Sequence, residues 1–374
     1  MRPVRVAVAG SVDDGKSTFL GRLMSDAQRL FVDEIEAVRR ASRAEELNLA
    51  FFTDGLTVER EQGITLDVAW RHLVLGSKRL LLADVPGHAE LVRNMATGAS
   101  TADAAVLLVD AVRGVQPQTR RHLVMLAGLG VKTVIACLNK MDGVAFSAER
   151  AATLSAPLAE LAGALGLELE TIPISALEGD HVVVPSDRLP WFRGPTVAQR
   201  LMTLEARPQP SAVRAAVQLD TASSGWTAVH LLSGELSPGQ ELDALPHGTR
   251  SAVLEVSPLS PTRVRLASAE RRGTLLATPG TVAVGHASPA IVTVLEPLAE
   301  GTACRLLQSG RSTPVWLDAL RKLSLETGRP VAASELSAGD VALATLRLAE
   351  PTWLTGEALL IDALGRTVAG VRFT

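Results

Sequence analysis

The sequence predicts an α/β domain, with a mostly parallel sheet and helices on both faces, followed by a β-rich second half. In the first half, apolar strand-like runs alternate with segments of helical spacing, which is typical of parallel sheets covered on both faces. In the second half, short β-rich runs are broken by Gly and Pro at close spacing, which favours barrels or sandwiches. A proline-containing linker at 207–210 separates the two halves.

Length and composition indicate a globular protein of two or three domains. The chain has 374 residues, whereas single hydrophobic cores stop growing at roughly 250–300 residues. Its net charge is −3, so no global basic field points to nucleic acid or an anionic membrane. Apolar runs such as Ala104–Val109 fall short of the ~20 residues that a bilayer requires, and no signal peptide opens the chain. We therefore expect a cytoplasmic protein with no membrane partner and with buried thiols at Cys137 and Cys304.

The elements of the first half follow from the spacing of apolar residues. An apolar run that ends in glycine at Val4–Gly10 predicts a buried strand, and Ser17–Gln28 has the spacing of a helix. Two strand-like runs joined at Gly76-Ser77 predict a hairpin. The expected strands are Val4–Gly10, Asp67–Leu75, Arg79–Val85, Ala104–Ala111, Thr133–Asn139 and Thr171–Ser175, and the expected helices are Ser17–Gln28, Ala89–Thr97, Gln116–Gly128 and Ala148–Leu165.

The elements of the second half are short strands between turn signals. Evenly spaced short strands with turn signals suggest barrels or sandwiches rather than a further α/β domain. One segment, Leu317–Leu325, has helical spacing and is predicted as a helix. The expected strands are Ala215–Leu219, Ala228–Leu232, Arg263–Leu266, Thr281–Val284 and Ala290–Leu295.

A phosphate-binding loop is predicted directly after the first strand. Residues 10–17 (GSVDDGKS) match G-x-x-x-x-G-K-[ST] between a strand and a helix, which is the context that this motif requires. Backbone N–H groups of such a loop bind phosphates, and the helix N-terminus adds a favourable dipole. Lys16 is expected to reach the β- and γ-phosphates, and the Ser17 hydroxyl to bind Mg²⁺. The residues expected to line this part of the site are Gly10, Ser11, Val12, Asp13, Asp14, Gly15, Lys16, Ser17 and Thr18.

A second phosphate motif follows the hairpin. Asp84 and Gly87 form D-x-x-G, which alone matches many turns but here stands at the expected place after the phosphate loop. Asp84 is expected to hold Mg²⁺ through water, and the Gly87 N–H to meet the γ-phosphate. Thr65 lies in a polar segment between the first helix and the hairpin. A threonine there can complete the magnesium shell when GTP is bound and leave it after hydrolysis.

Guanine selection is predicted from a motif after the strand Thr133–Asn139. Asp142 can accept hydrogen bonds from N1–H and the 2-amino group of guanine, donors that adenine lacks. Asn139 is expected to brace the loops, and the stem of Lys140 to lie against the base. Backbone N–H groups at the sequence Ser175, Ala176 and Leu177 are expected near guanine O6. The sequence therefore predicts a site for GTP with Mg²⁺.

His88, directly after D-x-P-G, resembles the translation-factor class of GTPases, in which a histidine positions the attacking water. The resemblance implies that His88, Lys16 and Thr65 are the catalytic residues, with Val12 and Ile64 flanking the histidine. In this class two small β-barrels follow a P-loop G domain. We accordingly expect a G domain at residues 1–205, one barrel at 206–286, and a divergent, shortened barrel at 287–374.

A narrower resemblance covers residues 4–205, where the chain is similar to the large, GTP-hydrolysing subunit of bacterial sulfate adenylyltransferase. The likeness thins after the linker, and the chain stops well short of a typical member. No second phosphate-loop motif appears, so no fused phosphosulfate kinase is expected. The segments that carry the resemblance are 10–18 (GSVDDGKST), 54–56 (DGL), 59–65 (EREQGIT), 93–101 (RNMATGAST), 118–122 (QTRRH), 139–142 (NKMD) and 175–180 (SALEGD).

The resemblance implies a heterodimer, or a higher assembly, with a small adenylyltransferase subunit that transfers AMP from ATP to sulfate. This chain would couple GTP hydrolysis to that reaction. Three alternatives stay open: a divergent paralogue in a specialised biosynthetic pathway, a translation-type factor that binds tRNA or the ribosome, and a GTP-dependent regulatory or metal-delivery switch. The second would need an excess of Lys and Arg on its barrels, whereas residues 206–374 hold 15 basic and 15 acidic residues.

Overall fold

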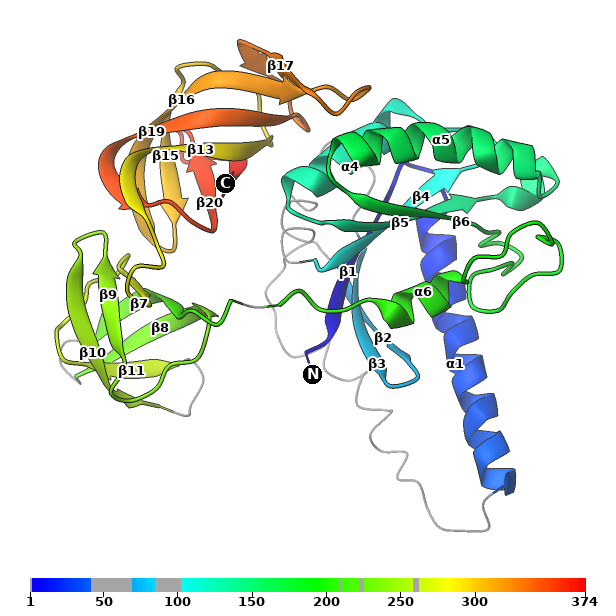
Figure 1. Cartoon of the computed structure of the whole chain (residues 1–374), viewed down its shortest axis with the longest axis horizontal. Helices are drawn as coiled ribbons and strands as arrows, with labels where there is room; N and C mark the ends of the chain where they lie inside the picture. Colours follow the sequence, from blue (N-terminus) through cyan, green and yellow to red (C-terminus); the bar gives the residue numbers. More distant parts are fainter. Residues whose placement is uncertain (1, 42–68, 85–101, 209, 222–224, 258–261) are drawn as a thin grey trace. The chain divides into compact units, whose positions relative to one another are not determined.

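The computed structural model describes residues 2–41, 69–84, 102–208, 210–221, 225–257 and 262–374 (Figure 1). The chain separates into two compact units. The first comprises Met1–Ala206 with Leu325–Gly328, and the second comprises Arg207–Ser324 with Arg329–Thr374. Among the residues described, no helix is both long and apolar enough to span a bilayer.

The first unit is built on a 6-stranded sheet with the order β2-β3-β1-β4-β5-β6. β2 pairs antiparallel with β3, and all other neighbours are parallel. Gly10 at the end of β1 lies beside Leu108, and Asp110 at the end of β4 lies beside Asn139, so the loops that follow these strands emerge at one edge. The strands are β1 (Val4–Gly10), β2 (Ala69–Leu75), β3 (Lys78–Asp84), β4 (Ala104–Asp110), β5 (Thr133–Asn139) and β6 (Glu168–Pro173).

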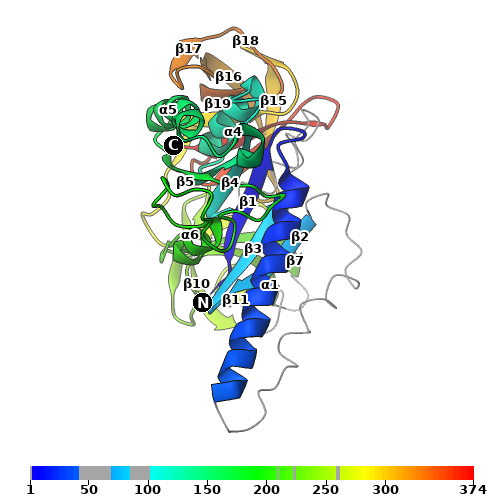
Figure 2. The same cartoon turned by 90° about the vertical axis from the view of Figure 1, so that its right-hand side faces the viewer.

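Helices cover both faces of this sheet (Figures 1 and 2). α1 (Lys16–Ala41) and α6 (Val197–Thr203) share one hydrophobic core with β1, into which α1 directs Phe19 and Leu23. α4 (Pro117–Gly128) and α5 (Ala148–Ala164) lie together over the other face. A short 3₁₀ turn, η4 (Met141–Val144), follows β5. The expected helix Ala89–Thr97 lies outside the described residues.

The second unit begins with a closed antiparallel barrel in the order β10-β11-β8-β7-β12-β9, closed by pairing of β9 with β10. Its core takes alternate residues, such as Ala215 and Val217 of β7, because successive side chains of a strand point to opposite faces. The strands are β7 (Arg214–Thr221), β8 (Trp226–Ser233), β9 (Glu241–Leu245), β10 (Thr249–Val256), β11 (Arg263–Leu266) and β12 (Leu275–Ala277).

A second barrel follows in the order β15-β20-β21-β13-β19-β16, closed by pairing of β15 with β16 and extended by β17. Ala290, Val292 and Val294 of β13 alternate into its core. β14 and β18 form a separate small pair. The strands are β13 (Val284–Val294), β14 (Leu298–Ala299), β15 (Ala303–Gln308), β16 (Arg311–Leu323), β17 (Pro330–Ala332), β18 (Glu335–Leu336), β19 (Val341–Trp353), β20 (Glu357–Ile361) and β21 (Thr367–Phe373). The predicted fold class, an α/β domain followed by two barrels, is confirmed.

Two predicted elements of the second half are wrong. The helix expected at Leu317–Leu325 is largely part of strand β16, and the strand expected at Thr281–Val284 is a turn that reaches β13 only at its last residue. In β16 the pairing register shifts between Asp318 and Arg321, and Ala319 has φ of 52°. This bulge inserts a residue, so the buried Leu317 and Leu320 stand three apart, which is the spacing of a helix.

Candidate functional site

The loop between β1 and α1 has a conformation that depends on its glycines. Gly15 has φ of 91°, and a Cβ atom placed there would stand 2.4 Å from Nδ2 of Asn139. Gly10 packs against Leu108, whose Cβ would be 3.0 Å from an added Cβ. Because only glycine provides both the positive φ and the space at position 15, the loop can wrap tightly over the end of the sheet.

Polar contacts inside this loop fix its shape. The Ser11 N–H donates to Oδ2 of Asp14 at 2.7 Å, and Nζ of Lys16 donates to the carbonyls of Gly10 (2.7 Å) and Ser11 (3.0 Å). Burial lowers the pKa of Lys16, and the carboxylates of Asp14, Asp84 and Asp13 oppose that shift. Burial also raises the pKa of Asp14. A loop folded around an ammonium group at a helix N-terminus suits a polyphosphate.

Asn139 joins the phosphate loop to a second loop that follows β6. Its Nδ2 donates to the Asp14 carbonyl at 2.8 Å, and its Oδ1 accepts from the Ala176 N–H at 2.9 Å. The side chain is buried, so both groups need these partners. The structure thus places residues 10–18 and 175–177 on the two sides of one amide.

Asp142 and Lys140 flank this joint. The Ser175 hydroxyl donates to Oδ1 of the exposed Asp142 at 2.5 Å. Nζ of Lys140 donates to Oδ2 of the buried Asp110 at 2.7 Å, which stretches the lysine stem from the β5 loop toward the end of β4. Burial would raise the pKa of Asp110, but the Lys140 bond and the backbone N–H groups of Arg113 and Val112 hold it below its usual range.

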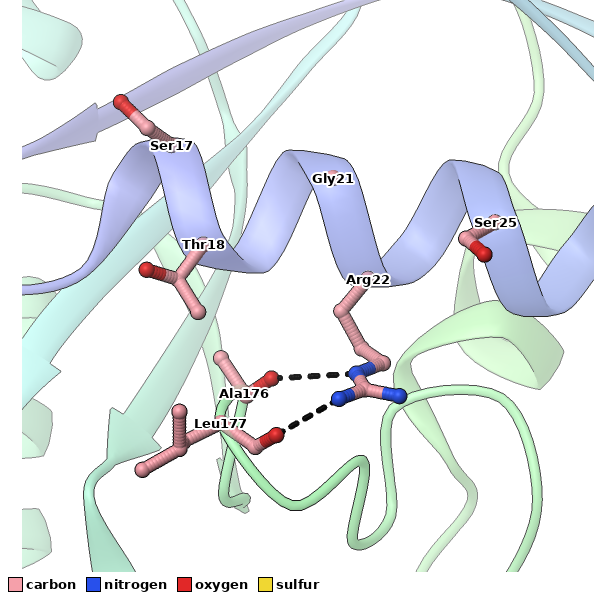
Figure 3. Close-up of a pocket in the computed structure, with 7 residues that line it drawn as sticks. All are labelled: Ser17, Thr18, Gly21, Arg22, Ser25, Ala176 and Leu177. Atoms are coloured by element: carbon pink, nitrogen blue, oxygen red, sulfur yellow. Dashed lines mark hydrogen bonds between the residues drawn. The ribbon is translucent and has the colours of Figure 1, made fainter.

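A cavity of about 330 Å³ opens between the first turns of α1 and residues 176–177 (Figure 3). Thr18 and Arg22 lie on the side of α1 that faces Ala176 and Leu177, whereas the Ser17 hydroxyl points the other way. The cavity therefore lies beside the loop of residues 175–177, and Ser17 lines it although its hydroxyl points away from that loop. Its lining residues are Ser17, Thr18, Gly21, Arg22, Ser25, Ala176 and Leu177.

The structure brings most of the predicted site residues to one edge of the sheet. Asp84 ends β3, where it lies beside Val8 of the phosphate-loop strand. Thr65, Gly87 and His88 lie outside the described residues, so their roles stay predictions. Within the described ranges, no three His, Cys, Asp or Glu side chains gather as a metal-binding group.

Sequence reasoning missed one polar residue of this edge, Arg22. Its guanidinium donates to the carbonyls of Ala176 and Leu177. A signal was present, because Thr18 and Arg22 stand four apart on one face of the helix that begins at the phosphate loop. Nothing local indicates, however, that this face meets a loop more than 150 residues later.

Comparisons with known proteins show the family to which the chain belongs. Residues 1–235 match the family described as elongation factor Tu GTP binding domain. The chain is 34% identical over 404 aligned residues to sulfate adenylyltransferase subunit 1 of Citrobacter koseri, covering 98% of this chain and 85% of that protein. The crystal structure of a bacterial selenocysteine-specific elongation factor, EF-Sec, aligns with a TM-score of 0.48 at 20% identity, covering 100% of this chain and 58% of that chain.

Proposed function

Because this chain is a translation-factor-type GTPase that belongs to the family of sulfate adenylyltransferase subunit 1, we propose that it is the GTP-hydrolysing subunit of a sulfate adenylyltransferase complex. One observation carries the proposal: the similarity to that subunit extends over 98% of this chain, so it includes both barrels as well as the GTP-binding domain. In the proposed complex a small partner subunit transfers AMP from ATP to sulfate, releasing pyrophosphate. This chain drives that uphill reaction with GTP.

The proposed nucleotide site uses the two loops that Asn139 joins. Lys16 reaches the β- and γ-phosphates of GTP, and the Asp142 carboxylate accepts hydrogen bonds from N1–H and the 2-amino group of guanine. The Ser175 hydroxyl bonds one oxygen of Asp142, but the Asp142 side chain stays exposed. Its carboxylate is therefore open to a base. Lys140, extended toward Asp110, offers its stem as a flat apolar surface for the purine.

Hydrolysis in this proposal needs few chemical groups from the protein. Water attacks the γ-phosphorus, the bond to the β–γ bridging oxygen breaks, and GDP and phosphate leave. His88 orients the water, and Lys16 offsets charge on the β- and γ-phosphates. Mg²⁺, held by Ser17, Thr65 and, through water, Asp84, would supply further positive charge between these phosphates. Loss of the γ-phosphate releases the segments around Thr65 and His88, which signals the partner.

The test is reconstitution with a small adenylyltransferase subunit from the same organism. We expect the two proteins to co-purify, and GTP to stimulate pyrophosphate release from ATP and sulfate. A nucleotide analogue with a non-hydrolysable β–γ bond should not sustain the stimulation. His88→Ala should bind GTP with unchanged affinity and lose most turnover and coupling. Pyrophosphate release that does not respond to GTP, in a complex that has formed, would refute the proposal.

A further inference from the structure

Residues 175–177, which we call the base-selecting loop because they are proposed to face guanine, contact Arg22 as well as Asn139. Nε of Arg22 donates to the Ala176 carbonyl at 3.3 Å, and its Nη2 donates to the Leu177 carbonyl at 2.6 Å (Figure 3). A guanidinium presents its donors in a rigid plane, so it can serve two successive carbonyls at once, whereas an ammonium group cannot do so with fixed geometry.

Other contacts also hold this loop: the side chain of Ala176 packs in the buried core, and the Gly179 N–H donates to the Ser175 carbonyl at 2.8 Å. The Ala176 N–H donates to Asn139, so the peptide groups of the loop are held by Asn139 on one side and by Arg22 on the other. The side chain of Leu177 is 63% exposed and adds little packing. Gly179, with φ of 89°, turns the chain back beside Arg22, whose Cδ would stand 3.4 Å from an added Cβ. Within this loop, Arg22 is the side chain that bonds the carbonyls of both Ala176 and Leu177.

The same arginine connects the two ends of the proposed nucleotide site. It stands on α1 six residues after Lys16, so the helix that begins at the phosphate loop also carries the support of the base loop. Its ion pair with the half-buried Asp26, at 3.6 Å between Nη1 and Oδ1, uses a different nitrogen and leaves Nε and Nη2 for the carbonyls.

We propose that Arg22 is a positioning residue for guanine selection: it sets the orientation of residues 176–177 so that the backbone N–H group of Leu177 faces O6 of the base, while the Ala176 N–H stays bonded to Asn139. This inference rests on the proposed nucleotide site. It adds a specificity residue outside the nucleotide motifs, one that acts on the base end of GTP and GDP alike and does not touch the phosphates.

The test compares nucleotides that differ at O6. For Arg22→Ala in the full chain, we expect the affinities for GTP, GDP and inosine triphosphate, all of which carry O6, to fall by the same factor of about ten. The affinity for 2-aminopurine riboside triphosphate, which lacks O6, should stay within about twofold of its wild-type value, because the misplaced Leu177 N–H has no acceptor to lose. Arg22→Lys should give an intermediate loss for the O6 nucleotides.

Two controls separate this role from general destabilisation. Asp26→Asn removes the ion pair but keeps both carbonyl bonds, and should leave every affinity unchanged. Arg200, on α6, has a similar exposure and bonds Glu170 of β6 and Thr203. Arg200→Ala should therefore also leave the nucleotide affinities unchanged. Equal losses for nucleotides with and without O6, or no loss at all, would overturn the inference. A wild-type protein with no preference for GTP over ATP would instead refute the proposed nucleotide site.

Discussion

At the scale of single residues, the site is organised by side chains that satisfy buried backbone groups of distant loops. The Asn139 amide bonds the Asp14 carbonyl and the Ala176 N–H, whereas Asp142, three residues later, is exposed. Such a division is expected, because a buried amide must be fully bonded whereas a binding carboxylate must stay open. In the proposed site, binding and positioning therefore fall to different members of one short motif.

Asp142 should determine the choice of purine. In Asp142→Asn, one hydrogen-bond acceptor of the carboxylate is replaced by an amide donor, which faces the donor groups of guanine. We expect the affinity for GTP to fall by about a hundredfold or more, with ATP unaffected. The measurement is competition between GTP and ATP for a fluorescent GDP analogue, with the exposed Asp187→Asn as the control. Undiminished preference for GTP would show that another group selects the base.

Gly15 should be irreplaceable in the phosphate loop. In Gly15→Ala the new methyl group would stand 2.4 Å from Nδ2 of Asn139, and the residue would keep a φ of 91° that alanine rarely adopts. Strain of this kind costs about 1–3 kcal/mol, so GTP and GDP affinities should both fall by roughly 5- to 100-fold. Gly163→Ala, on α5, is the matched control, because a Cβ added there meets no neighbouring atom within 4 Å. It should bind both nucleotides normally. Equal affinities in both variants would contradict the role given to this glycine.

Much of the site follows from short motifs, because the phosphate loop, Asn139 and Asp142 each carry their chemistry in adjacent residues. Arg22 does not, since its partners lie over 150 positions away and only the folded sheet brings them together. The Asp110 partner of Lys140 is similar: pairing of β4 with β5 places Asp110 beside Asn139, and no local pattern shows this. Long-range polar contacts are therefore the part of the site that sequence patterns leave out.

At the scale of elements, α4 places a titratable group in the interior. His122 is 3% exposed, and Nε2 of its ring lies 3.2 Å from Nε2 of Gln118, an amide donor that a neutral imidazole can accept. Burial, together with the positive charges of Lys16 and Arg121, lowers the pKa of His122 to about 4. The helix is therefore folded around an imidazole that stays neutral.

This burial should make the stability of α4 depend on pH. Between pH 6.5 and about 4 the unfolded chain takes up a proton at His122 that the folded chain does not, so the free energy of opening falls as the pH falls. The loss should approach roughly 3 kcal/mol at pH 4. Hydrogen exchange of α4 peptides, corrected for intrinsic rates, would measure it. His122→Gln should remove this dependence, whereas the exposed His72→Gln should retain it, and identical pH profiles would refute the assignment.

The elements themselves were predictable where one periodicity runs uninterrupted. β1, β4 and β5 are continuous apolar runs because both faces of a central parallel strand are covered. β16 was not predictable in this way. Its bulge at Ala319 breaks the alternation of period two and gives its buried residues the spacing of a helix. The prediction of element type thus fails where the backbone departs from regular geometry. Such a departure depends on the strand that pairs with the segment as much as on the segment itself.

At the scale of the whole molecule, charge separates the proposed function from a factor that carries tRNA. The net charge is −3, and residues 206–374 hold 15 basic and 15 acidic residues. Many of these cations already face carboxylates on the barrels. The pairs are Arg250 with Glu241 and Asp243, Arg265 with Glu255, Arg311 with Glu350, Lys322 with Asp340, Arg347 with Asp318, and Arg366 with Asp362. A nucleic acid would have to displace these carboxylates to reach the cations.

We therefore expect no specific binding of tRNA. A protein that neutralises several phosphates shows a steep linear fall of log K with log salt, at about −0.9 per phosphate for duplex nucleic acid. Anisotropy of labelled tRNA, titrated with the GTP-loaded protein at stepped KCl concentrations, should show weak binding at low salt and none near about 0.15 M, where exposed charges are screened beyond ~8 Å. A short basic peptide serves as the positive control. Tight binding that depends on GTP, with a slope of several phosphates, would favour a translation factor and contradict a chain built to dock a protein subunit.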